Sequence, residues 1–185
     1  MDNLKFNMKV AKTAISLVSR IYGFDDAILI EFDKETRFPN KEVMALATSD
    51  FRIVFNNDKL REATDYEVYI TSFHEIRHIY QRCCIEFGKS YRQLKESKKR
   101  IKQWKYEDDH YYVSELIDDE KYLKQDIEID AIAFSYYMMD LLFENKVILP
   151  ESIKKEALKR AKEIGRKLSH NKYVKLIKAH REYII

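Results

Sequence analysis

The stretch TDYEVYITSFHEIRHIYQRCCIEFG, residues 64–88, decides the fold because it carries both ends of one long helix. Thr64 and Glu67 form a Thr-x-x-Glu capping box, in which each side chain satisfies a backbone N–H that the start of a helix leaves free. Gly88 is typical of the position just beyond a helix C-terminus. The pattern therefore predicts a helix from Asp65 to Phe87, with no glycine or proline inside it.

Helical periodicity recurs on both sides of this segment. Residues 4–22 place apolar side chains at helical spacing and end before Gly23. The other predicted helices cover about residues 121–145, 150–164 and 171–183. Pro150 suits the first turn of its helix, and Gly165 is the expected stop. Residues 131–143 are apolar nearly all round, which is typical of a buried helix.

Short runs with strand character lie between the first helix and residue 64. They cover residues 27–32, 43–47 and 51–55. Turn signals separate or end them at Phe38-Pro39-Asn40 and at Asn56-Asn57-Asp58. We therefore expect an α+β, mostly helical fold in which a small antiparallel sheet packs against the helices.

The composition agrees with a folded helical protein. The chain has 185 residues, of which 45% are hydrophobic and 13% aromatic, and these values argue against intrinsic disorder. It has only 3 Gly and 2 Pro, which disfavours turn-rich all-β architectures. The net charge of +3 comes from 34 basic and 31 acidic residues, so the overall charge does not indicate a nucleic-acid-binding protein.

We expect a single domain over residues 1–185, with an inserted segment at about 89–120 and C-terminal helices at about 150–185. The insertion is basic in its first half and acidic in its second. Its basic run, over residues 95–105, is interpreted as a solvated helix face. Contact with nucleic acid or with an acidic partner is the alternative, both there and on the basic C-terminal helices.

Two features bear on the cellular compartment. Cys83 and Cys84 are adjacent, and neighbouring cysteines rarely bridge each other, so we interpret them as free, buried thiols of a reducing compartment. The chain has no run of 18 apolar residues and no signal-peptide pattern. We therefore expect no membrane association and a cytoplasmic location.

The polar signal of the decisive helix is His74-Glu75-Ile76-Arg77-His78, an H-E-x-x-H motif. Residues at i and i+4 lie on one helix face, about one turn apart. Two imidazoles placed in this way bind one tetrahedral Zn²⁺ ion, and the intervening Glu75 can take a proton from the bound water. The alternative is a pair of surface histidines on a charged helix.

A catalytic zinc ion needs a third protein ligand and an open fourth position. The longer pattern with a third histidine is excluded, because Gln81 and Cys84 occupy the positions that require Gly and His. Glu128 is the favoured third ligand, since it opens an increasingly apolar run and a carboxylate on a buried face needs a partner. Asp130 and then His110 are the alternatives.

Two separated motifs, His74-Glu75-x-x-His78 and Glu128-x-x-Ala131-x-x-Phe134, together resemble the ImmA/IrrE-type zinc metallo-endopeptidases. Residues 52–56 are similar to the strand that precedes the first motif in that family. The resemblance covers about residues 4–143. The chain departs from the family in a longer gap between the two motifs, in Ser135, and in Ile76-Arg77.

This resemblance implies a zincin-like fold and a cytoplasmic, zinc-dependent endopeptidase that hydrolyses a peptide bond of a protein substrate. The implied substrate is a regulator, such as a helix-turn-helix repressor encoded beside the protease on a phage or mobile element. A non-catalytic regulatory or nucleic-acid-binding protein on a zincin-like scaffold is the alternative.

The expected mechanism is hydrolysis by metal-activated water. His74, His78 and Glu128 are the expected Zn²⁺ ligands, and Glu75 is the expected base that passes a proton to the leaving amine. An electrophile should stabilise the oxyanion. The candidates for this role are Tyr111, Tyr112, His110 and His170. Asp130 is a candidate to orient a histidine ring, and an edge of the sheet is a candidate to hold the substrate as an added strand.

Overall fold

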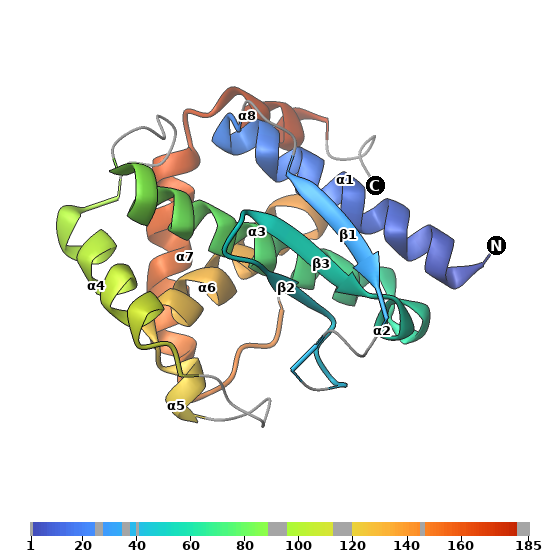
Figure 1. Cartoon of the computed structure of the whole chain (residues 1–185). Helices are drawn as coiled ribbons and strands as arrows, with labels where there is room; N and C mark the ends of the chain where they lie inside the picture. The colour runs from blue at the N-terminus through green and yellow to red at the C-terminus, as the bar shows by residue number, and fades with distance from the viewer. Residues whose placement is uncertain are drawn as a thin grey trace.

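The computed structural model describes residues 2–24, 28–34, 38–39, 41–88, 96–112, 120–144 and 147–180. Its helices are α1 (Asn3–Tyr22), α2 (Asn57–Glu62), α3 (Asp65–Phe87), α4 (Lys98–Asp109), α5 (Glu120–Leu123), α6 (Asp126–Phe143), α7 (Lys154–Leu168) and α8 (Lys172–Ala179). Its strands are β1 (Leu29–Asp33), β2 (Ala45–Ala47) and β3 (Arg52–Asn56). The described part is therefore mostly helical with one small sheet (Figure 1).

The sheet has the strand order β1-β3-β2 and is mixed. β2 pairs antiparallel with β3, but β1 pairs parallel with β3, so the prediction of a purely antiparallel sheet is wrong. The reason lies in the chain path: β2 and β3 form a hairpin, and β3 then lies beside β1, which runs in the same direction. Ile53, Val54 and Phe55 are buried in this central position.

The two ends of α3 are as the sequence predicts. The capping box joins Thr64 and Glu67, and the C-cap is Gly88 with φ 60°. α1 also ends as predicted, at Gly23 with φ 67° in the left-handed region that glycine adopts without strain. In contrast, α2 was not predicted. Asn56 does not form a turn there; its side chain accepts hydrogen bonds from the first N–H groups of α2.

The C-terminal half differs from the sequence prediction at three helix ends. The helix predicted over residues 121–145 is divided into α5 and α6 around Lys124 and Gln125. α7 begins at Lys154 and continues through Gly165, where a Cβ atom would lie 3.0 Å from the ring of Tyr137. Gly165 therefore permits close helix packing and does not end the helix. α8 begins after its N-cap Asn171 as predicted, and the predicted end at Tyr183 lies outside the described residues.

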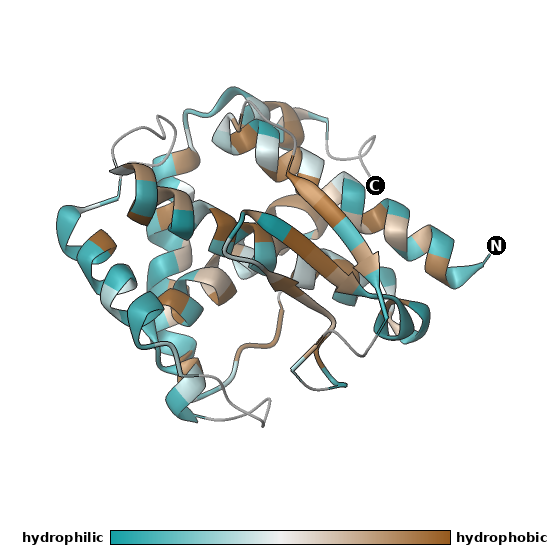
Figure 2. Ribbon diagram, viewed as in Figure 1, coloured by the Kyte–Doolittle hydropathy of each residue, from teal (hydrophilic) through white to brown (hydrophobic). Residues whose placement is uncertain are grey.

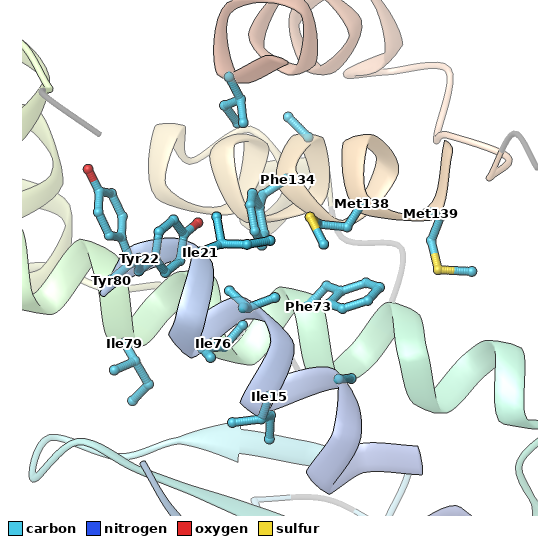
Figure 3. Packing of buried hydrophobic residues seen from close by; sticks show 14 of the residues in the cluster. Ile15, Ile21, Tyr22, Phe73, Ile76, Ile79, Tyr80, Phe134, Met138 and Met139 are labelled. Atoms are coloured by element: carbon cyan, nitrogen blue, oxygen red, sulfur yellow. The ribbon is translucent and has the colours of Figure 1, made fainter. Parts of the chain in front are cut away.

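The core is formed mainly by α1, α3 and α6. Figure 3 shows side chains from these three helices meeting in one cluster, among them Ile21 of α1, Phe73 of α3 and Phe134 of α6. The strands of the sheet are largely apolar, whereas α7 presents many hydrophilic residues (Figure 2). This packing fixes α3 and α6 side by side, and these are the two helices that carry the predicted metal ligands.

The described part of the insertion is helical. Trp104 of α4 is fully buried, so this helix is anchored to the domain by its one tryptophan. Lys98, Lys99, Lys102 and Lys105 of the same helix are exposed, in agreement with a solvated basic face. Residues 89–95 and 113–119 lie outside the described part. None of the described helices is long and apolar enough to span a membrane.

Candidate metal centre

Three predicted ligands meet where α3 lies against α6. The Nε2 atoms of His74 and His78 are 2.9 Å apart. Glu128 Oε2 lies 3.3 Å from His74 Nε2, and Glu128 Oε1 lies 3.4 Å from His78 Nε2. One ligand atom from each residue lies within 4.8 Å of the others, so this group could hold a metal ion.

The chemistry of the donor set fits a cation. Glu128 is fully buried, and its Oε2 atom has no hydrogen-bond partner among the described residues. Burial alone would raise the pKa of Glu128, but the neighbouring His78 and His74 imidazoles and the Tyr111 hydroxyl outweigh burial and lower it to about 2. A buried carboxylate that stays ionised needs a positive partner, and a metal ion between two imidazoles is one.

Glu75 lies beside this group in a different environment. Its side chain is buried, with the residue 8% exposed. Burial raises the pKa of Glu75 from 4.5 to about 7, and the charge of Glu128 acts in the same direction against the opposing effects of His78 and a backbone hydrogen bond from Ala47. The two environments thus separate the pKa values of the two carboxyl groups: Glu128 is held ionised, whereas Glu75 exchanges a proton near neutral pH in the metal-free protein.

The group opens onto a cavity of about 690 Å³. Its lining includes His74, Glu75 and His78 on one side and residues 43–47, which contain β2, on another. Along β2, successive residues direct their backbone N–H and C=O groups alternately toward β3 and away from it. Met44 O accepts from Asn56 N and Thr48 N donates to Arg52 O, each at 2.8 Å. The alternate residues, Ala45 and Ala47, therefore turn their backbone polar groups away from β3.

The structure distinguishes between the tyrosine candidates for stabilising an oxyanion. Tyr111 lines the cavity, and its hydroxyl donates a short hydrogen bond to Glu128 Oε1. Burial and then the charge of Glu128 raise the pKa of Tyr111, so its hydroxyl remains a donor. The Tyr112 ring packs instead against Lys121, whose Nζ lies 4.0 Å from the ring centroid.

The two histidine candidates lie away from the cavity lining. His110 is the C-cap of α4; its Nδ1 is 2.8 Å from Tyr106 O and its ring stacks on Tyr106. His170 is exposed after the end of α7. Neither residue lines the cavity, so the geometry does not bring His110 to the ligand group as an alternative third ligand.

Asp130, the other alternative ligand, is turned away from the metal group. It accepts hydrogen bonds from Arg77 Nε at 2.7 Å, from Arg160 Nε at 2.5 Å and from Gln81 Nε2 at 2.7 Å. Within the described part of the chain, Cys83 and Cys84 are buried thiols that form no disulfide, as predicted. Asp130 therefore belongs to a buried ion-pair network behind the ligands.

Two residues at the site were missed by the sequence-based interpretation. Tyr122 lines the cavity, and its hydroxyl lies 3.3 Å from that of Tyr111. With 13 Tyr in the chain, no sequence signal distinguished it from the others. Gln81 contacts His78, and here a signal existed, because a polar residue at i+3 on a buried helix face is on the same side as the histidine.

Comparison of the chain with protein-family models, with curated proteins and with solved structures gave no match.

Proposed function

We propose that the protein is a zinc-dependent endopeptidase with a zincin-like active site, similar to the ImmA/IrrE-type enzymes. The observation that carries the proposal is the meeting of His74, His78 and Glu128 at one cavity with Glu75 beside them. Two imidazoles, one carboxylate and an adjacent second carboxylate form the ligand and base set of a catalytic zinc site. The lining of the cavity by a strand edge is consistent with a peptide substrate.

His74, His78 and Glu128 would hold the ion. When bound, Zn²⁺ would supply Lewis acidity, which makes a water nucleophilic near neutral pH and polarises the carbonyl of the substrate. Glu75 would accept a proton from the attacking water and donate it to the leaving amine. In the metal-free protein, burial and the charge of Glu128 raise the pKa of Glu75 to about 7. A bound cation would lower this pKa, so Glu75 would meet the attacking water as an ionised carboxylate that can accept its proton.

Tyr111 would donate a hydrogen bond to the oxyanion. Its hydroxyl lies at the edge of the ligand group and remains protonated, because burial and Glu128 raise its pKa. In this structure the single hydroxyl proton is donated to Glu128 Oε1, so the role requires the hydroxyl to turn from Glu128 to the substrate oxygen. A donor placed next to the reacting carbonyl stabilises the charge that develops there. Of the candidates named from the sequence, Tyr111 has the position for this role.

The substrate would bind in an extended conformation along β2. The outward backbone groups of Ala45 are turned toward the cavity side of the strand, which is the arrangement that adds a further strand to a sheet. Because only main-chain groups take part in such pairing, β2 would bind peptides of many different sequences. Selectivity among substrates would then depend on pockets that contact their side chains. A helix-turn-helix repressor remains the proposed substrate class, by resemblance to the family.

The function is tested by metal content and by cleavage. Protein purified without chelators is expected to contain about one Zn²⁺ per chain by elemental analysis. His74→Ala should lose the metal, whereas Glu75→Gln should keep the metal and lose cleavage of a proteome-derived peptide library followed by mass spectrometry. Glu75→Gln is the matched control, because any cleavage that it retains comes from a contaminant. Wild-type protein that contains no metal, or equal cleavage by the wild type and Glu75→Gln, would reject the proposal.

A second candidate function is nucleic-acid binding on the same scaffold. Four cations of α7, Lys155, Lys159, Lys162 and Arg166, line a shallow groove and are exposed. None of them has an ion-pair partner within the described ranges. Contact with phosphates predicts an affinity for double-stranded DNA that falls steeply with salt, and fluorescence anisotropy at two salt concentrations measures it. An affinity that does not change with salt would reject this candidate.

A further inference from the structure

One ring nitrogen of His78 faces the ligand group and the other faces Gln81. His78 Nε2 lies 2.9 Å from His74 Nε2, while His78 Nδ1 lies 2.8 Å from Gln81 Oε1. Gln81 is fully buried, one turn farther along α3. The question is which of the two nitrogens of the neutral imidazole carries the proton, since only the unprotonated one can bind a metal ion.

The surroundings of Gln81 fix the direction of this hydrogen bond. Gln81 Nε2 lies 2.8 Å from the main-chain oxygen of Ile127 and 2.7 Å from Asp130 Oδ2. Both neighbours are acceptors, so the NH₂ end of the amide must face them and the oxygen must face His78. An amide oxygen only accepts, and His78 Nδ1 must therefore donate.

We infer that Gln81 is a positioning residue that holds His78 as the Nδ1–H tautomer and so leaves Nε2 free to bind the metal. This inference rests on the metal centre of the proposed function, but it concerns a hydrogen bond that exists without the ion. Glu128 Oε1 lies 3.4 Å from His78 Nε2 and would favour a proton on that nitrogen. The hydrogen bond to Gln81 opposes this effect, because it favours the proton on Nδ1.

The orientation of Gln81 is in turn fixed by Asp130. Asp130 accepts from Arg77 through Nε at 2.7 Å and Nη2 at 3.0 Å, and from Arg160 Nε at 2.5 Å. Both arginines are buried, and they come from α3 and α7. A carboxylate that two arginines hold ionised can only accept hydrogen bonds, so Gln81 must donate to it. The chain Arg160–Asp130–Gln81–His78 thereby transmits a fixed orientation from α7 to the proposed ligand.

The use of an amide has a chemical consequence. Many metal-binding histidines donate their second N–H to a carboxylate, which adds negative charge and raises the basicity of the ring. Here the carboxylate of Asp130 is already paired with two arginines, and the neutral Gln81 stands between it and His78. Gln81 thus sets the tautomer without adding charge next to the site.

The tautomer is measured directly on metal-free protein labelled with ¹⁵N-histidine, by long-range ¹H–¹⁵N correlation NMR. The spectra are recorded at alkaline pH. In the wild type, Nδ1 of His78 should be the protonated nitrogen and Nε2 the unprotonated one. A proton on Nε2 would overturn the inference. This measurement needs neither metal nor activity, so its failure is distinct from the failure of the proposed function.

Substitution of Gln81 gives the second test. Gln81→Met keeps the approximate size of the side chain but removes the acceptor, so the tautomer should shift toward Nε2–H. Its Zn²⁺ affinity, measured against a competing chelator, should fall by about 10–100-fold.

The matched control is Ser135→Ala, which removes another buried polar group from the α3–α6 contact. Within the described residues, Ser135 Oγ donates to Ile70 O at 3.2 Å and Ala131 O at 3.1 Å, and Ser135 is not part of the proposed ligand group. Its Zn²⁺ affinity and the His78 tautomer should stay at wild-type values. A loss of affinity equal to that of Gln81→Met would mean that general loosening of the helix pair is responsible, and it would overturn the inference.

Discussion

Arg77 forms a fully buried, two-pronged ion pair with Asp130, in which Nε lies 2.7 Å from Oδ2 and Nη2 lies 3.0 Å from Oδ1. Arg77 is the residue just before His78, so one turn of α3 carries a proposed metal ligand on one face and this ion pair on another. The guanidinium carbon also lies 4.3 Å from the ring centroid of Tyr80. Arg77 Nη1 donates a hydrogen bond to the hydroxyl oxygen of Tyr22 at 2.8 Å. Arg77 is one of the positions at which the sequence departs from the family pattern that it resembles, and it has a structural partner in Asp130.

Replacing Arg77 by Met should destabilise the metal-free protein strongly. The substitution leaves Asp130 buried with fewer partners, and removal of one member of a buried pair costs about 3–5 kcal/mol. The free energy of unfolding from urea denaturation measures the loss.

Arg82→Met is the control for this prediction. Arg82 lies on the same helix as Arg77 and pairs with Asp108 of α4 at 3.2 Å, but the two side chains are 24% and 30% exposed. A pair of this kind contributes about 1 kcal/mol or less. Equal destabilisation by the two variants would contradict the interpretation of the Arg77 pair as buried and essential.

The stability of the metal-free protein should depend on pH through Glu75. Because burial raises the pKa of Glu75 from 4.5 to about 7, the folded protein holds this proton more tightly than the unfolded chain. The stabilising contribution is full below pH 4.5 and is lost as the pH rises through about 7. The interval between 4.5 and about 7, at about 1.4 kcal/mol per pH unit, corresponds to a loss of about 3 kcal/mol.

Glu75→Gln isolates this contribution, because Gln resembles the protonated carboxyl group and does not titrate. The two proteins should have similar unfolding free energies near the lower end of this interval, and the variant should become the more stable one as the pH rises. Chemical denaturation of both proteins across the interval measures the difference. Two curves that stay parallel would show that Glu75 is not buried as a neutral acid.

How far the sequence predicts the site depends on the range of the interactions. The α3 caps, the spacing of His74 and His78, and the setting of Glu128 are local signals, and the structure brings these three predicted ligands together. The choice of Tyr111 over Tyr112 is not local, since it depends on how the chain after α4 returns to α6. The parallel pairing of β1 with β3 is similarly a long-range result that strand patterns do not determine.

Tyr111→Phe should lower kcat for a peptide that the wild type cleaves, with little change in KM. Loss of one hydrogen-bond donor to an oxyanion costs about 10²–10³-fold in kcat. Tyr112→Phe is the matched control, because its ring packs on Lys121 away from the cavity lining. Both variants are assayed at equal metal content. Equal rates for the two variants, or a Tyr111→Phe loss that disappears once metal content is matched, would contradict a role in stabilising the transition state.

Added Zn²⁺ should stabilise the folded protein by an amount that depends on the Zn²⁺ concentration, and its removal should reverse this effect. A ligand that binds only the folded state at about 100 times its Kd stabilises that state by about 2.7 kcal/mol. Thermal melting with added Zn²⁺ and then with excess chelator should therefore show a reversible shift in Tm. Glu128→Gln should abolish the shift, since it removes the charge of a fully buried ligand. Asp126→Asn, at a side chain 42% exposed in the first turn of the same helix, should keep it. A shift that survives in Glu128→Gln would place the bound metal elsewhere on the protein.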